Sequence, residues 1–330
     1  MSFDNLNKDL EDKKANIFLL MALTALSYGI LLLGMLLPFV AIMGLALIAV
    51  PATVLVLTGR KRDGIICAVA GSLFMFFVNY LLAVFFIIYI VSVCFLYLRF
   101  YKEDSSPYRI ILYSGLVLTG VLLAYSLAVS IADQASMYTG FLESYRQYID
   151  NITEDPLIGR YAELTGISKS QMDLMIGQSR QVLLFIPYLL PSLLTVFIFG
   201  ASLLNYYFST YFLKRYGVFL VKIKDFADWD IPWYYCWGII GGLVFVLIPD
   251  FNAVFDRVLD IAGFNLLAVF ISLYTVLGFS VIIGIFKKYK LSVGFRFIIF
   301  FILLFLGIIF LVPLLGLADI WINIRRLKRK

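Results

Sequence analysis

The sequence lacks charged residues over seven long stretches. Asp, Glu, Lys, Arg and His are all missing from residues 17–59, 64–98, 110–132, 181–213, 231–249, 261–286 and 297–318. One membrane crossing takes roughly 20 mostly apolar residues, so each stretch can cross a bilayer once and the longest can cross twice. Charged residues make up 15% of the chain, against about 25% in typical globular proteins. The sequence therefore predicts an all-α, polytopic transmembrane helical bundle with about 8–10 membrane segments.

Histidine is also missing, and no acidic residue lies inside the apolar stretches. Histidine is the commonest general base and a frequent ligand of zinc and haem, and proton relays usually need ionisable groups at membrane depth. The chain contains no Walker A, Rossmann, HExxH or GxSxG motif. We therefore expect a non-enzymatic protein with no catalytic residues, no cofactor and no metal site. Any uphill transport would draw its energy from a partner protein.

Cysteine is scarce. Cys67, Cys94 and Cys236 are far apart in the sequence, and each lies in an apolar stretch. Because they lack CxxC spacing, we interpret them as small buried hydrophobic residues. The first 16 residues mix acids and bases and lack a small-residue cleavage site, so the first apolar stretch is expected to remain as a membrane span.

The net charge of +6 is spread over short loops between apolar stretches. This placement favours contact with anionic lipid headgroups at the cytoplasmic face and argues against nucleic-acid binding. With the N-terminus in the cytoplasm, the outer segments ahead of the C-terminal tail hold just five bases, which are Arg146, Arg160, Lys169, Arg180 and Arg257. The positive-inside rule therefore predicts a multi-pass membrane protein with a cytoplasmic N-terminus.

The last apolar stretch allows the C-terminus to lie on either side of the membrane. A single helix through residues 297–321 would place the five bases of the tail, residues 325–330, outside the cell. A hairpin bent near Gly307 or Pro313 would return the tail to the cytoplasm. We favour the hairpin because it keeps these bases inside.

Three regions are expected along the chain. Residues 1–131 form an N-terminal membrane bundle of about five spans, and residues 132–180 form a small extracytoplasmic helical insertion. Residues 181–330 form a C-terminal membrane bundle, with a cytoplasmic loop at 207–232 and the basic tail at 325–330.

Local sequence signals predict the helix ends. Gly34–Pro38 and Asn79–Tyr80 should each turn the chain between two spans, and Pro187 and Pro191 should bend the sixth span. In the insertion, Ser168 and Gln171 have the spacing of a helical capping box. Apolar residues ahead of it recur on one face of an amphipathic helix, at Phe141, Tyr145, Tyr148 and Ile149.

The loop at residues 207–232 is a candidate surface for contact with a partner or with lipid. It combines Lys214 and Arg215 with aromatic residues and an acidic cluster around Trp229. Trp229 could anchor a cytoplasmic or membrane partner protein, since Trp and Arg are common at binding hot spots. Alternatively, the bases pair with lipid headgroups and the Trp side chains lie in the interfacial aromatic belt.

Polar residues inside the spans are the candidate ligand-binding residues: Asn79, Tyr80, Asn265 and Tyr274. They could line a site for a small, largely uncharged solute. Amide and hydroxyl groups at membrane depth also hydrogen-bond between helices, so the same residues could instead stabilise the bundle. The sequence leaves both interpretations open.

Asp319 lies between the last apolar stretch and the basic tail. It could form an ion pair with Arg325 or Arg326 at the membrane interface, which needs no further function. The alternative is a buried ligand or proton site. Asp319 and Arg325 are therefore the remaining candidates for contact with a partner or with lipid.

Two segments, Tyr211–Trp237 and Leu315–Arg325, resemble signatures of the YybS-like family of bacterial multi-pass membrane proteins. The order of features is similar along the whole chain, with four close spans, a fifth, an outer polar insertion, a sixth, a basic loop with Trp and Pro, and a hydrophobic C-terminal region. That family, whose activity is not established, is distantly similar to the S components of energy-coupling-factor transporters. S components take up vitamins and have about six helices.

The resemblance implies a location in the bacterial plasma membrane. It also implies capture of a small solute from outside, with cytoplasmic ATPases supplied by a separate module. S components dock the coupling subunit through a small-residue motif on their first helix, and Ala25 and Gly29 approximate that motif here. The first hypothesis is thus an S-component-like protein that binds a solute among its helices. The second is a membrane scaffold or regulatory protein that acts through the loop or the outer insertion and transports no ligand. A cavity lined by the polar residues would favour the first hypothesis, and a filled interior the second.

Overall fold

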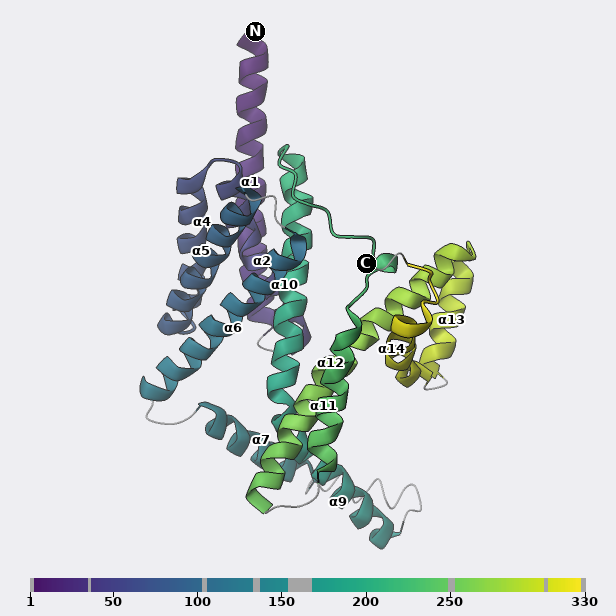
Figure 1. The fold of residues 1–330 in the computed structure, drawn as a ribbon. Coiled ribbons are helices and arrows are strands. Elements are labelled where there is room, and N and C mark those ends of the chain that lie inside the picture. The colour runs from purple at the N-terminus through teal and green to yellow at the C-terminus, as the bar shows by residue number, and fades with distance from the viewer. Residues whose placement is uncertain are drawn as a thin grey trace. The chain divides into compact units, whose positions relative to one another are not determined.

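The structure, a computed structural model, describes residues 3–34, 37–102, 106–132, 137–153, 168–248, 253–305 and 308–327 (Figure 1). Helices are the regular elements of these segments, and no strand occurs in them. Five helical segments are long and apolar enough to cross a membrane. The predicted all-α, polytopic membrane fold is confirmed.

The chain packs as two units. The first comprises residues 1–143 and 197–222, and the second comprises residues 144–196 and 223–330. The predicted boundaries after residues 131 and 180 concern position relative to the membrane, and they remain predictions. Each unit is described by itself below.

The first unit is built from apolar helices joined by short turns. Its helices are α1 (Phe3–Leu33), α2 (Pro38–Ile48), α3 (Val50–Leu57), α4 (Lys61–Phe76), α5 (Tyr80–Lys102), α6 (Pro107–Ala132) and the second part of α10 (Leu190–Arg215). The turns expected at Gly34–Pro38 and Asn79–Tyr80 are confirmed, because α1 ends at Leu33 and α5 begins at Tyr80. Pro38 starts α2, where its missing N–H costs no helical hydrogen bond.

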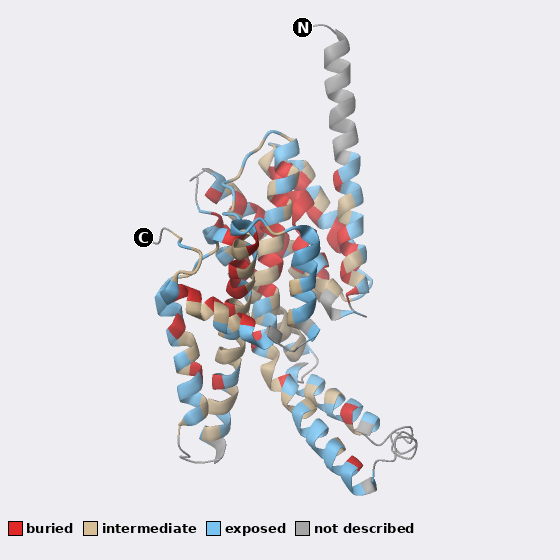
Figure 2. Ribbon diagram, turned by 90° about the vertical axis from the view of Figure 1, so that its right-hand side faces the viewer, coloured by how far each residue is buried: buried red, intermediate tan, exposed pale blue. Residues whose placement is uncertain are grey.

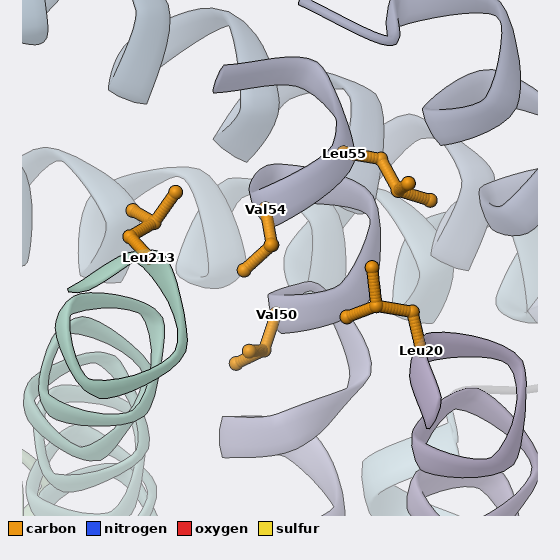
Figure 3. Packing of buried hydrophobic residues seen from close by; sticks show 5 residues of the cluster. All are labelled: Leu20, Val50, Val54, Leu55 and Leu213. Carbon is orange, nitrogen blue, oxygen red and sulfur yellow. The ribbon is translucent and has the colours of Figure 1, made fainter. Parts of the chain in front are cut away.

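The core of this unit joins residues from distant parts of the sequence. Leu20, Val50, Val54, Leu55 and Leu213 form one buried cluster (Figure 3). Polar side chains add links between helices. The hydroxyl of Tyr97 donates to Oδ1 of Asn205 at 2.9 Å, and Nδ2 of Asn205 donates to the carbonyl of Ala46 at 2.8 Å. This amide therefore connects α2, α5 and α10.

The second unit contains α9 (Lys169–Phe185), the 3-10 turn η1 (Ile186–Leu189), η2 (Phe226–Asp228), η3 (Trp233–Tyr235), α11 (Cys236–Leu247), α12 (Ala253–Lys288), α13 (Val293–Phe305), η4 (Ile308–Leu311), α14 (Val312–Ile322) and most of α7 (Met137–Thr153). The predicted capping box is confirmed, since Ser168 and Gln171 satisfy each other's backbone N–H groups at the start of α9. The predicted bend at Pro187 and Pro191 is confirmed as the turn η1 between α9 and α10.

Two contacts join the helices of the polar insertion. The hydroxyl of Tyr145 donates to the carbonyl of Leu183 at 3.1 Å, and Arg180 forms an ion pair with Asp150 at 2.8 Å. The amphipathic helix expected around Phe141 is α7. Residues 154–167 of the predicted insertion lie outside the described residues.

The last apolar stretch forms two helices rather than one. Helices α13 and α14 contain 13 and 11 residues. At a rise of about 1.5 Å per residue they are roughly 20 Å and 16 Å long, shorter than the bilayer core of about 30 Å. Helix α14 packs against α12. This division agrees with the predicted hairpin, whose bend near Gly307 lies outside the described residues.

Large apolar side chains remain exposed on many helices of both units. Figure 2 shows exposed residues along the outer sides of the helices, and exposed fractions reach 90% for Phe77 and 80% for Phe310. An aqueous protein rarely exposes apolar surface on this scale. Lipid chains are as apolar as these side chains, so the pattern fits helices that face a bilayer.

Candidate functional site at the basic end of helix α12

Asn265 connects α12 to the proline-bent start of α10. Its Nδ2 donates hydrogen bonds to the carbonyls of Tyr188 at 2.7 Å and Ile261 at 2.8 Å. Its Oδ1 accepts a hydrogen bond from the backbone N–H of Ser192 at 2.9 Å. In an uninterrupted helix, the N–H of Ser192 would donate to the carbonyl of Tyr188. At this bend the amide of Asn265 bonds to both groups instead. The structure places Asn265 as a link between helices.

The other three candidate ligand residues lie in different surroundings. Asn79 accepts a hydrogen bond from the N–H of Leu82 at 3.2 Å and so caps α5, and the neighbouring Tyr80 is 57% exposed. Tyr274 is fully buried, and its hydroxyl has no hydrogen-bond partner within the described part of the chain. Asn265 and Tyr274 share α12 but are about 13 Å apart along its axis.

Two cavities stand out in the described residues, and neither is lined by Asn79, Tyr80, Asn265 or Tyr274. One, of about 310 Å³, lies in the first unit among α1, α3 and α4 and is mainly apolar, with Arg60 and Asp63 in its lining. The other, of about 270 Å³, lies in the second unit at the end of α12.

The three candidate residues of the loop differ in exposure. Lys214 and Arg215 are exposed in the last turn of α10, where the guanidinium of Arg215 lies 4.8 Å from the ring centre of Tyr211. Trp229 is half-buried. Its indole N–H donates to the carbonyl of Lys224 at 3.0 Å, and its ring packs edge-on against Phe226. Trp229 therefore helps to shape the loop itself.

Asp319 and Arg325 form a buried ion pair. Nη2 of Arg325 lies 2.8 Å from Oδ2 of Asp319, and their side chains are 3% and 0% exposed. The pairing predicted for Asp319 is confirmed with Arg325, and the pair is buried within the second unit. Removing two charges from water is costly, and a buried pair persists when further hydrogen bonds satisfy it.

Those further bonds hold a short loop segment against α12. Nη1 of Arg325 donates to the carbonyl of Ala227 at 2.7 Å and to Oγ of Ser280 at 2.6 Å. Oγ of Ser280 donates in turn to the carbonyl of Phe226 at 2.6 Å. Lys287, in the last turn of α12, forms an ion pair with Asp225. The segment 225–229 is thus bound by side chains from α12 and from the C-terminal turn.

Close helix packing and a tight turn bring Arg325 to this place. A Cβ atom on Gly278 would lie 2.0 Å from the carbonyl oxygen of Val312, so α12 and α14 approach more closely than any larger residue allows. Asn323 ends α14 in the left-handed region with φ of 50°. Its amide then bonds to both the N–H and the carbonyl of Leu327, which closes the turn that carries Arg325.

Sequence reasoning found Asp319, Arg325 and the loop but not the residues that join them. Ser280 was recognisable only as a polar residue in a span, and Asn323 as an amide following an apolar stretch. Asn after a helix is a common terminator, so Asn323 carried a local signal. Nothing in the sequence pairs Ser280 with Arg325.

The site combines an ordered loop segment with several charged side chains. Its charged groups are Lys287, Lys288, Arg325, Asp225 and Asp319. In the described residues no three Asp, Glu, Cys or His side chains come together as a metal site. The arrangement orders the loop segment 225–229 and places Lys287 and Arg325 in direct contact with it.

These features define a class: a polytopic helical membrane protein with a loop ordered by a buried Asp–Arg pair. The chain belongs to the family described as "Predicted membrane protein (DUF2232)". The model of that family matches residues 25–320. The matched region includes Asp319 and ends ahead of Arg325. No curated protein and no solved structure matched the chain.

Proposed function

We propose that the protein is a non-enzymatic membrane scaffold that recruits a partner protein to the cytoplasmic face. Its docking surface would consist of loop residues 223–235, which are held by Arg325 from the C-terminal turn. The observation that carries the proposal is the anchoring of the carbonyl of Ala227 by the buried guanidinium of Arg325. A loop ordered before binding loses less entropy when a partner docks, which favours recognition.

The side chains of the docking surface suit protein recognition. Trp233 and Tyr234 are 58% and 55% exposed, and Lys224 of the same loop is also exposed. Exposed Trp and Tyr residues commonly serve as binding anchors. In this proposal they replace Trp229 as anchors, because Trp229 packs inside the loop. The basic character of the loop supports its cytoplasmic placement by the positive-inside rule.

The experiment places a photocrosslinking amino acid at Tyr234 in living cells. We expect one protein to crosslink, and we expect Arg325→Gln to remove most of that crosslink because the loop loses its anchor. Ser280→Ala is a milder second variant, since it leaves the ion pair of Arg325 intact and removes the hydrogen bonds of Ser280 with Phe226, Trp229 and Arg325. Arg326→Gln is the matched control because Arg326 is exposed.

The identified protein is then purified and its affinity for each variant is measured in detergent. A loss of about tenfold in Arg325→Gln, with Arg326→Gln unchanged, would support the scaffold proposal. Crosslinks to lipid alone, or equal affinities for both variants, would contradict it. Unfolding curves of the variants separate loss of docking from loss of fold.

A second candidate function is capture of a small solute by the first unit. The observation that favours it is the number of helices in that unit, which is similar to the number in S components. They are α1, α2–α3, α4, α5, α6 and the end of α10. Thermal unfolding against a panel of vitamins, nucleobases and lipid precursors tests it, because a ligand of the folded state raises the melting temperature. A saturable shift that Asn79→Ala abolishes would support solute capture, and a shift unchanged by that substitution would argue against this residue's role.

A further inference from the structure

The cavity at the end of α12 lies between three parts of the second unit. Its lining comes from the last turn of α12, from Ala227 and Asp228 in the loop, and from the turn that carries Arg325. Its volume of about 270 Å³ is below the roughly 300–1,000 Å³ of sites for drug-sized ligands. The space therefore suits a small polar group rather than a large molecule.

Positive charge dominates this lining. Lys287, Lys288 and Arg325 contribute cations, and Asp228 contributes a carboxylate. Further bases, Lys290 and Arg326, follow directly in the sequence. Cationic side chains outnumber carboxylates in the lining by three to one, so the lining offers more hydrogen-bond donors to an anionic ligand than carboxylate oxygens to a cation.

Two of the lining cations already have carboxylate partners, and one does not. Lys287 pairs with Asp225, and Arg325 pairs with Asp319. Among the described residues Lys288 forms no ion pair, and its ammonium group lies 5.7 Å from the ring centre of Tyr289. Lys288 is therefore the cation that an incoming anion would neutralise.

Arg325 retains one donor for such a ligand. Its guanidinium has five N–H groups, and the bonds to Asp319, Ala227 and Ser280 engage four of them. The fifth has no partner in the part of the chain that the structure describes. Since the side chain is 3% exposed and held by four bonds, this donor is presented in a fixed orientation.

We propose that this cavity binds a phosphate group, held by the ammonium of Lys288 and the remaining guanidinium N–H of Arg325. Phosphate oxygens accept strong, charge-assisted hydrogen bonds from both types of cation. The group can come from the headgroup of an anionic phospholipid or from a soluble phosphate compound. The cavity adjoins the end of a helix long enough to cross the membrane, where basic pockets commonly meet headgroups. This inference does not depend on recruitment of a partner protein.

The test uses the purified full chain in detergent and two matched lysine variants. Lys288→Gln removes the exposed cation from the last turn of α12, and Lys61→Gln removes an exposed cation from the start of α4, outside the cavity. Binding of short-chain phosphatidylglycerol is measured by native mass spectrometry. Binding of inorganic phosphate and pyrophosphate is measured by calorimetry.

We expect Lys288→Gln to weaken binding of at least one probe by about tenfold and Lys61→Gln to leave it unchanged. Dependence on Lys288 for the lipid alone identifies a headgroup, and dependence for the soluble probes identifies a soluble phosphate. Equal binding by the two variants, or no saturable binding of any probe, would overturn the proposal. Partner crosslinking at Tyr234 is scored separately, so the two proposals can fail independently.

Discussion

At the scale of single residues, Arg325 and Asp319 carry opposite charges in a region that water hardly reaches. A pair of this kind is often neutral for stability as a whole, because desolvation offsets the attraction between the charges. Loss of one member is different, since it leaves the other charge buried alone. The pair therefore accounts for the ordering of the loop. It does not by itself account for the stability of the protein.

We predict that Asp319→Asn destabilises the protein by about 3–5 kcal/mol, because Arg325 would stay buried without its countercharge. Asp63→Asn is the control, since Asp63 pairs with Arg60 at 2.7 Å but 43% of its side chain is exposed. Exposed pairs contribute about 0–1 kcal/mol. Denaturant unfolding in detergent measures both variants, and equal losses would show that burial of the Asp319 pair is unimportant.

Asn265 is the polar residue whose structural role is most fully accounted for. Replacement by Leu would leave the carbonyl of Tyr188 and the N–H of Ser192 without their partner in an apolar environment. We predict a loss of about 1–3 kcal/mol. Ser272→Ala is the matched control on α12, because the side chain of Ser272 bonds, among the residues that the structure describes, only to Ala268 of its own helix. If both variants unfold at the same denaturant concentration, the link between α12 and the bend does not contribute to stability.

At the scale of secondary-structure elements, the packing of α12 against α14 decides where the C-terminal turn lies. Gly278 allows the carbonyl of Val312 to approach its Cα closely, and Gly316 meets the backbone of Tyr274 in the same way. Small residues at helix crossings are a general means of close packing in membranes. Here they bring the turn that follows α14 to the basic end of α12.

We predict that Gly278→Ala separates these two helices and weakens the anchoring of the loop. The new methyl group would stand 2.0 Å from the Val312 oxygen, too close for any adjustment of side chains alone. A cost of about 1–3 kcal/mol is typical of such overpacking. Gly294→Ala in α13 meets no atom within 4 Å, and it should be neutral or stabilise by about 0.5–1 kcal/mol through helix propensity. A neutral Gly278→Ala in the same assay would mean that the helices do not need this close approach.

The whole molecule has an orientation that the distribution of bases predicts and that labelling can test. Single cysteines at Lys61, Lys290 and Gln178 are introduced after the three native cysteines are replaced by Ala. By the positive-inside rule, we expect an impermeant thiol reagent to label position 178 in intact cells and the other two only after permeabilisation. Labelling of position 290 in intact cells would refute the predicted orientation of the C-terminal region.

The contact between Arg325 and Ala227 spans 98 positions of the chain. Local sequence rules reach only a few residues, so they predict helix ends such as Ser168 and bends such as Pro191 but not this contact. Asp319 and Arg325 are close in sequence, and their pairing was predictable for that reason. Their burial was not predictable, because it results from the packing of α14 on α12.

The sequence by itself determined that this is an all-α, multi-pass membrane protein, because long charge-free stretches can be solvated only by lipid or by one another. Capping and turn residues also determined many helix ends locally. Only the tertiary structure decided which polar residues meet. It made Asn265 a link between helices and gathered Ser280, Asp319 and Arg325 around one loop segment. The physical reason is that hydrogen bonds and ion pairs join groups by distance in space, which depends on how whole helices pack.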